Sequence, residues 1–272
     1  MGGWRWVRVL PGGLALVLLA ACASGGGALL TPSSVAPTTA STAPTPTSAG
    51  APTSAGAPTS AAPRPAHFNT LPVGAALPSE EQCAQWVRKT PETRPMNTPY
   101  NETRGFGSPA DPPMPLYKRV TGNFTGTTDE ILQWGACKWG IDEDIVRAQA
   151  AKESWWTQTN VGDNGESFGI LQARQPYMEW AFNNGVGDAR SSTAFNVDAS
   201  LAARRNCFEG NETWLNTPDR GRDYAAGDIW GCVGMWFSGR WYTQPAVDYI
   251  AAVQDYLKNE VWLTNDFLKY SG

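Results

Sequence analysis

The chain is 272 residues long; 42% of its residues are hydrophobic and 17% are charged. A chain of this length can bury a sizeable core, because the buried fraction of the surface rises with size. Its formal net charge of −4 argues against a nucleic-acid partner, which would favour a basic patch. The 13 Trp and 8 Tyr residues predict an aromatic-rich core or, alternatively, a groove in which flat rings stack on sugars.

Residues 1–21 have the pattern of an export signal. Two arginines, Arg5 and Arg8, precede an apolar stretch that is too short to span a bilayer. The stretch ends in Leu-Ala-Ala-Cys at residues 19–22, which resembles the lipobox of bacterial lipoproteins. The resemblance implies cleavage before Cys22 and a diacylglyceryl group on its thiol; the alternative is a secretory signal with an accidental cysteine. We therefore expect an extracytoplasmic protein of the cell envelope, anchored to the membrane by lipid at Cys22.

Residues 22–66 predict a disordered linker that begins with the lipidated cysteine. After that cysteine the segment consists almost entirely of Ala, Pro, Thr, Ser and Gly, and Ala-Gly-Ala-Pro-Thr-Ser occurs twice in tandem over 49–60. Too few apolar side chains are present to offset the entropy lost on ordering. Proline favours an extended chain at about 3.1 Å per residue, so the linker would reach on the order of 100 Å.

The folded part is expected to begin near His67. Residues 67–126 are rich in Pro, Gly, Asn and Thr. This composition predicts an irregular arm packed on the main domain, with one short helix over 80–88.

The pattern becomes helical from Thr127, which forms a capping box with Glu130 ahead of an apolar run. This helix is expected to end near Gly140, and Asp142 caps a second helix that ends at about residues 153–154. The further elements expected are a short strand over 168–173 and helices over 177–183, 197–208, 230–237 and 245–259. The sequence thus predicts a mainly α domain over 127–272 with a small β region.

Four cysteines remain besides the one in the lipobox: Cys83, Cys137, Cys207 and Cys232. An even number in an oxidising compartment predicts two disulfides. Three pairings are possible, and we prefer Cys83–Cys137 with Cys207–Cys232 because this pairing closes the shortest loops. The only histidine, His67, lies at the edge of the linker, so a Cys–His or Ser–His catalytic pair is hard to build. A zinc site is equally poor, because there is one histidine and the cysteines are not closely spaced. We expect no metal and no cofactor.

Carboxylates are the remaining candidates for chemistry. Glu153-Ser154 closes the second predicted helix, and Gly-Ile-Leu-Gln at residues 169–172 follows a glycine-rich turn. This order resembles the lysozyme-like superfamily, and in particular its soluble lytic transglycosylases, in which a helix ending in Glu-Ser precedes a turn and a Gly-Leu-Met-Gln-type strand. The resemblance covers about residues 131–177. It implies a lysozyme-like domain that acts on the glycan strands of peptidoglycan, with Glu153 as the catalytic acid.

The physical setting predicted for Glu153 suits an acid. A helix C-terminus carries partial negative charge, and Val146 lies seven residues back on nearly the same face, so Glu153 can point towards the core. Both effects disfavour the carboxylate and should raise the pKa, as a general acid requires. A solvated or capping glutamate is the alternative interpretation.

The resemblance assigns less direct roles to nearby residues. Ser154 would hold the site together and Gln172 would line the sugar groove, with Phe168 and Gly169 beside it. Glycine at 169 lets the backbone approach a ligand closely, or else simply turns the chain.

The chain departs from the family further on. Gly-Met-Trp-Phe-Ser-Gly at 234–239 stands where the family often carries Ala-Ala-Tyr-Asn-Ala-Gly, so Trp236 replaces the tyrosine and Phe237 the asparagine. A Trp offers no hydroxyl to the acid. Tyr224 and Tyr242 are possible substitutes, and Trp236 and Tyr242 are also candidates for contact with sugar; core packing is the alternative for the Trp.

Three functions remain open, and in each the partner is the glycan strand. The first is a membrane-anchored lytic transglycosylase, in which Glu153 protonates the oxygen between N-acetylmuramic acid and N-acetylglucosamine and the C6 hydroxyl then closes a 1,6-anhydro ring. The second is a muramidase of the goose-type lysozyme kind, because Gly-Asp-Asn-Gly at 162–165 resembles the turn of that family and Asp163 would position a water. The third is a lipoprotein that binds wall glycan without cutting it.

Overall fold

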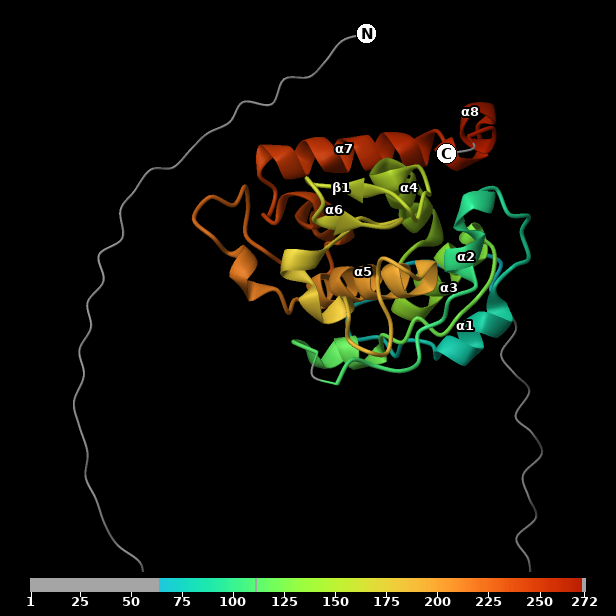
Figure 1. Ribbon diagram of the computed structural model, residues 1–272. Helices are drawn as coiled ribbons and strands as arrows, with labels where there is room; N and C mark the ends of the chain where they lie inside the picture. The colour runs from blue at the N-terminus through green and yellow to red at the C-terminus, as the bar shows by residue number, and fades with distance from the viewer. Residues whose placement is uncertain (1–63, 111, 271–272) are drawn as a thin grey trace, which may run out of the picture. The chain divides into compact units, whose positions relative to one another are not determined.

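A computed structural model describes residues 64–110 and 112–270. The predicted export signal, Cys22 and most of the predicted linker lie outside the described residues. The described chain is mainly helical, with eight α-helices and one small antiparallel sheet (Figure 1). The prediction of a mainly α fold with a small β region is therefore confirmed. None of the described helices is both long and apolar enough to cross a membrane.

The elements follow one another along the chain with short connections. The α-helices are α1 (Glu80–Trp86), α2 (Thr98–Asn101), α3 (Thr128–Trp139), α4 (Glu143–Ser154), α5 (Thr193–Phe208), α6 (Ile229–Ser238), α7 (Gln244–Lys258) and α8 (Asn265–Leu268). The sheet has the order β1-β2-β3, with strands β1 (Val161–Gly162), β2 (Ser167–Phe168) and β3 (Ala173–Arg174). Short 3-10 helices lie at 95–97, 115–119, 175–177, 179–181, 213–215 and 261–263.

Local capping signals set the ends of α3 and α4. Thr127 caps α3 by accepting a hydrogen bond from the backbone of Glu130, and Gly140 ends the helix in the left-handed conformation at φ 55°. Asp142 caps α4 in the same way. The capping box is only half formed, because the Glu130 carboxylate accepts a hydrogen bond from the backbone of Thr90 in the arm instead.

Two predicted elements differ from the structure. The strand expected over 168–173 is broken into β2 and β3 by a turn, because Gly169 and Gln172 both have positive φ. The helix expected over 177–183 is replaced by two 3-10 helices, the first of which has a proline in its opening turn. Helix α5 also begins four residues earlier than expected, where Ser192 caps it.

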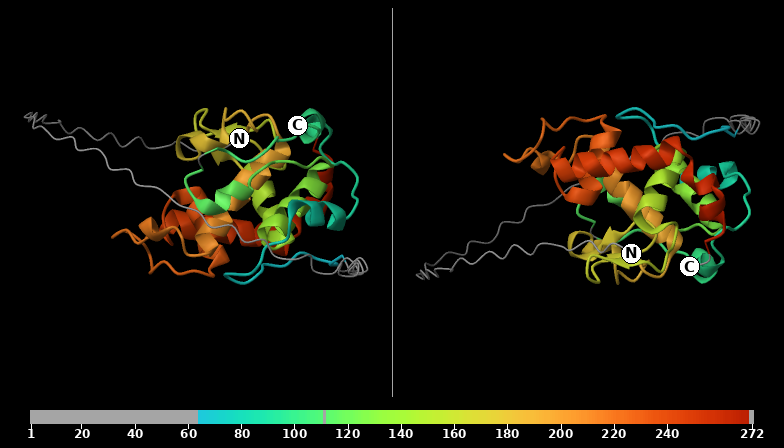
Figure 2. Two further views of the ribbon diagram at one scale, coloured as in Figure 1. Left: turned by 90° about the horizontal axis from the view of Figure 1, so that it is seen from below. Right: turned by 90° about the horizontal axis from the view of Figure 1, so that it is seen from above.

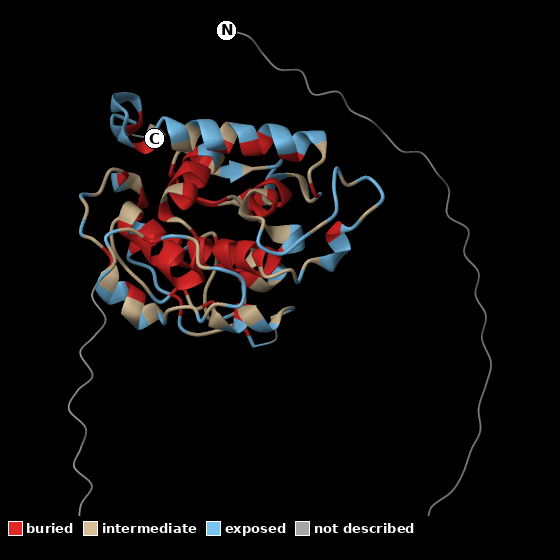
Figure 3. Cartoon of the chain, turned by 180° about the vertical axis from the view of Figure 1, so that it is seen from behind, coloured by how far each residue is buried: buried red, intermediate tan, exposed pale blue. Residues whose placement is uncertain are grey.

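Helix α5 forms the centre of the described unit. Every residue of α5 except Ala203 is buried, and the helix packs against α3 and α6. Helix α7 runs along one outer side next to α4 (Figures 1 and 2). Its outward face is exposed, whereas the inner helices are mostly buried (Figure 3). This packing places the inner face of α7 against the helix that carries Glu153.

Both disulfides have the predicted pairing. Cys83–Cys137 joins α1 to α3, and Cys207–Cys232 joins α5 to α6, with Cα–Cα distances of 5.7 and 5.8 Å. A disulfide typically contributes about 2–4 kcal/mol, mainly by constraining the unfolded chain.

The arm is joined to the start of α4 by polar contacts as well. His67 Nε2 lies 3.0 Å from the carboxylate of Asp142, and the backbone of Phe68 donates to Glu143 at 3.2 Å. The arm and the main domain therefore belong to one compact unit.

Candidate functional site

Glu153 is the second-last residue of α4, two residues before Trp155, where the chain turns in the left-handed conformation. The hydroxyl of Tyr249, a buried residue of α7, donates a hydrogen bond to Oε1 of Glu153. Gln149, one turn back on α4, donates to the same hydroxyl oxygen at 3.3 Å. Two helices thus hold one oxygen of the carboxyl group, and among the described residues Oε2 has no hydrogen-bond partner.

Burial raises the pKa of Glu153 from the ordinary 4.5 to about 7. The hydrogen bond from Tyr249 and the positive charges of Arg204 and Lys152 oppose the rise, and the charge of Asp163 adds to it. The direction agrees with the sequence prediction. At neutral pH about half of the molecules then carry the proton, which is the condition in which a general acid works best.

Tyr249 keeps its own proton at all relevant pH values. Burial and the adjacent Glu153 hold the pKa of the phenol well above its usual value of 10. The phenol therefore remains a hydrogen-bond donor whether or not Glu153 is ionised.

Ser154 joins the end of α4 to the turn between β2 and β3. Its hydroxyl donates to the carbonyl of Ile170 at 2.8 Å and accepts a hydrogen bond from the backbone of Thr157 at 3.0 Å. The serine that follows the candidate acid therefore fixes the distance between the acid and the Gly-Ile-Leu-Gln turn.

The turn itself is held from α5. Asn196 donates to the carbonyl of Phe168 at 2.8 Å and accepts from the backbone of Leu171 at 3.0 Å. Gly169 has φ 81°, and a Cβ there would lie 2.3 Å from the Asn196 amide nitrogen. Only glycine fits at this position, because the backbone must both turn and pack on the asparagine.

The side-chain amide of Gln172 forms hydrogen bonds with the nearby backbone. Its Nε2 donates to the carbonyls of Gly169 at 2.8 Å and Asn160 at 3.2 Å. The side chain is partly exposed, so its proposed contact with sugar would be made by the remaining surface.

The two departures from the family pattern both contact the site. The indole nitrogen of Trp236 donates to the carbonyl of Leu171 at 3.0 Å, which braces the turn from α6. Phe237 is 56% exposed, and its ring stacks on Tyr249 at 4.7 Å with an interplanar angle of 1°. Trp236 therefore supports backbone, while Phe237 covers the tyrosine that binds the acid.

The hydroxyl on Glu153 does not come from either tyrosine suggested by the sequence. Tyr242 binds the carboxylate of Asp228 at 3.0 Å. Tyr224 donates to the carbonyl of Cys207 at 2.5 Å. Sequence reasoning missed Tyr249, although it lies on the buried face of α7 with Ala246, Ile250 and Val253. A tyrosine within such an apolar stripe needs a partner for its hydroxyl, and that requirement was the available signal.

The carboxylates of the β1–β2 turn lie in solvent. The Asp163 side chain is 58% exposed and accepts a hydrogen bond from Ser167 at 2.5 Å. Glu166 is paired with Arg174 at 2.6 Å. Both therefore have partners suited to a surface turn.

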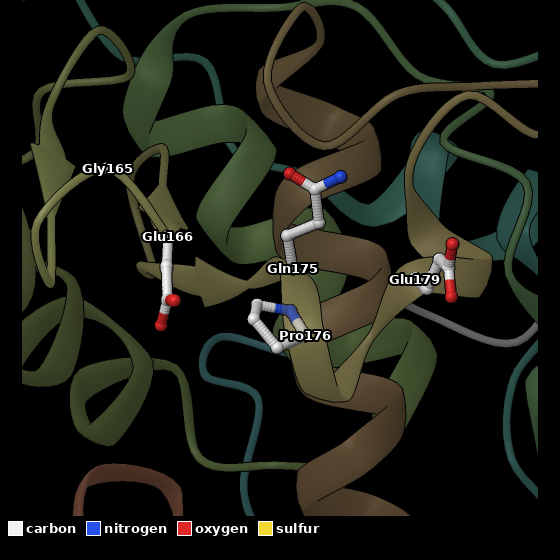
Figure 4. Close-up of a pocket in the computed structure, with 5 residues that line it drawn as sticks. All are labelled: Gly165, Glu166, Gln175, Pro176 and Glu179. Atoms are coloured by element: carbon white, nitrogen blue, oxygen red, sulfur yellow. The ribbon is translucent and has the colours of Figure 1, made fainter.

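Two surface hollows flank the sheet. One of about 140 Å³ includes Phe168 and Gly169, two of the predicted substrate contacts, together with Asn160. The other, of about 270 Å³, is shown in Figure 4, where Glu166 and Glu179 project on either side of Gln175 and Pro176. Glu153 lines neither of them.

One group of side chains has the donor types of a metal site. His67, Glu143 and Asp144 bring their ligand atoms within 4.8 Å of one another. Glu143, however, is already paired with Arg88 and Arg147. Because these guanidinium groups neutralise the carboxylates, we interpret the group as an ion-pair cluster that fixes the arm to α4.

Comparison of the chain with protein-family models, curated proteins and solved structures found no match.

Proposed function

We propose that the chain is a peptidoglycan lytic transglycosylase with a lysozyme-like domain, and that Glu153 is its only catalytic carboxylate. One observation carries the proposal. The carboxyl group of Glu153 is held by Tyr249 at the end of a helix, has a pKa raised to about 7, and is tied through Ser154 to the Gly-Ile-Leu-Gln turn.

The reaction needs one proton donor that later accepts a proton. Glu153 donates its proton to the oxygen that links N-acetylmuramic acid to N-acetylglucosamine, and the bond from that oxygen to C1 of the muramoyl ring breaks. The resulting carboxylate takes the proton of the C6 hydroxyl, and O6 bonds to C1. The acid is regenerated, and no water is consumed.

The hydrogen bond from Tyr249 determines which carboxyl oxygen of Glu153 transfers the proton. Because the phenol occupies Oε1, the mobile proton belongs on Oε2. Tyr249 also stabilises the carboxylate formed in the first step, since it donates throughout.

A muramidase of the goose-type lysozyme kind is the second candidate. The observation in its favour is that the charge of Asp163 acts on Glu153. An inverting hydrolase places its second carboxylate roughly 6.5–9.5 Å from the acid to activate a water. The exposure of Asp163 and its bond to Ser167 favour the single-carboxylate mechanism instead.

A non-catalytic wall-binding lipoprotein is the third candidate. It is suggested by Trp236 and Phe237, which replace the tyrosine and asparagine of the lytic transglycosylase pattern. Trp236 contacts the turn and Phe237 contacts Tyr249, and these contacts support the catalytic candidate over the non-catalytic one.

The location proposed for the domain follows from the N-terminal pattern. A lipid anchor at Cys22 and a linker reaching on the order of 100 Å would hold the domain outside the cytoplasm and let it reach the surrounding wall.

Release of soluble fragments from purified peptidoglycan tests the proposal. We expect wild-type protein to release them and Glu153→Gln to lose at least about 10²-fold in rate, the usual contribution of general acid–base catalysis. Glu81→Gln, at an exposed position of α1, is the matched control and should keep full activity. Equal rates for Glu153→Gln and wild type would exclude Glu153 as the acid.

A further inference from the structure

A buried cation, Arg204, acts electrostatically on the candidate acid, although the described residues show no hydrogen bond or ion pair between the two. Arg204 of α5 is 1% exposed, and its Nη1 donates to the carbonyl of Ser200 within its own helix at 2.8 Å. Its Nε and Nη2 are buried, and neither has a hydrogen-bond partner within the described part of the chain. A buried charge with unpartnered donors is costly, and few positions in a core keep one.

The titratable groups that act on Arg204 belong to the site. They are Tyr249 and Glu153, and of the two only Glu153 becomes charged near neutral pH. Burial lowers the pKa of Arg204 to about 10, so the guanidinium is still positive at neutral pH. The described residues form no ion pair between Arg204 and a carboxylate.

The Arg204 guanidinium group is also held in place by an aromatic ring. It lies over the ring of Trp236 at 4.0 Å, an arrangement in which the ring face attracts the cation. The same indole braces the turn through the carbonyl of Leu171. The tryptophan that replaces the family's tyrosine therefore positions a positive charge as well as the turn.

We propose that Arg204 is a positioning residue for the reaction, held on Trp236 so that its charge stabilises the carboxylate that Glu153 becomes when it gives up its proton. The inference rests on the proposed function. While Glu153 holds its proton it is neutral, so no ion pair is needed. Proton transfer creates an anion in a site of low dielectric, where a cation attracts it more strongly than in water.

The other charged and titratable groups that face Glu153 cannot take this role. Lys152 of α4 is exposed and lies beside the ring of Tyr256 at 5.9 Å. Asp163, in the β1–β2 turn, is negative and opposes ionisation of Glu153. Tyr249 of α7 supplies a hydrogen bond but no positive charge. Arg204 is therefore the buried cation among these groups.

The test compares neutral and charged replacements by two readouts. Arg204→Met and Arg204→Gln remove the charge, and the Gln variant keeps a donor that can reach the helix backbone; Arg204→Lys keeps the charge. The first readout is the NMR titration of the Glu153 carboxyl carbon, and the second is the pH profile of fragment release. Unfolding midpoints are measured for each variant.

Removing a positive charge makes ionisation of a carboxyl group less favourable. In both neutral variants we expect the Glu153 titration and the alkaline limb of the profile to move up by about one pH unit, and kcat to fall about tenfold or more. Arg204→Lys should restore most of both. The proposal is overturned if a folded neutral variant titrates like wild type, or if Lys, Met and Gln reduce kcat equally with an unmoved titration.

The two proposals fail in different ways. Wild-type protein that releases no fragments removes the proposed function, whereas the NMR titration still reports whether Arg204 acts on Glu153. Active wild-type protein with an unmoved titration in Arg204→Gln removes only the role of Arg204.

Discussion

The hydroxyl of Tyr249 donates a hydrogen bond to Oε1 of Glu153, across 96 residues of sequence and across the contact between α7 and α4. This bond opposes the effect of burial on Glu153, since a donor favours the ionised carboxylate. It also leaves the other oxygen of the carboxyl group for chemistry.

Loss of the phenol should therefore change the acid. In Tyr249→Phe the pKa of Glu153 should rise further, so the alkaline limb of the activity profile should move to higher pH, and kcat should fall about tenfold. The measurement is the rate of fragment release between pH 5 and 9. Tyr256→Phe, seven residues along the same helix, is the control and should keep the wild-type profile. An unmoved limb in Tyr249→Phe would show that the hydrogen bond does not act on the titrating group.

The raised pKa of Glu153 also has a consequence for stability. The folded pKa of about 7 lies above the ordinary 4.5, so the group contributes about 3 kcal/mol that is present below pH 4.5 and lost as the pH rises through 7. Glu153→Gln carries no such dependence. Urea unfolding at pH 4 and pH 8 should show the variant gaining on wild type by up to about 3 kcal/mol at the higher pH. Parallel changes in both proteins would mean that Glu153 titrates normally.

The membrane tether is tested at the N-terminus. Because Leu-Ala-Ala-Cys at residues 19–22 resembles a lipobox, Cys22→Ala should block processing or release the protein from the membrane fraction. Cell fractionation with an antibody to the folded domain measures this, and Ser24→Ala is the control. A Cys22→Ala protein that stays with membranes as the parent does would contradict the lipoprotein interpretation.

The parts of the fold that could be predicted depend on neighbours in sequence. Thr127, Gly140 and Asp142 set helix ends through hydrogen bonds and φ values within a few residues, and each does so in the structure. The prediction of a helix over 177–183 was wrong because apolar spacing alone does not distinguish an α-helix from the two short 3-10 helices that lie at 175–177 and 179–181. Loop length favoured the disulfide pairing that is observed.

The candidate site could be predicted only along one stretch of chain. Glu153 and the turn at 169–172 belong to a contiguous pattern, whereas Tyr249 and Arg204 come from α7 and α5. Whether these two side chains come close to the site depends on how the helices pack, and no local sequence pattern predicts that packing. The hydroxyl was therefore sought at Tyr224 and Tyr242, which bind other partners.

The turn carboxylates should be dispensable if Glu153 works alone. Asp163→Asn and Glu166→Gln remove charges that are exposed and paired with Ser167 and Arg174. We expect each variant to release fragments at more than half of the wild-type rate. A dead Asp163→Asn protein that remains folded would assign Asp163 to water activation.

The masses of the fragments released from purified peptidoglycan test most directly whether Glu153 cuts the strand without water. Transfer to the C6 hydroxyl leaves 1,6-anhydromuramoyl ends, which lie one water, about 18 Da, below the reducing ends left by hydrolysis. We predict anhydro ends throughout the wild-type digest. Fragments that carry only reducing ends would contradict the single-carboxylate mechanism and make the protein a muramidase.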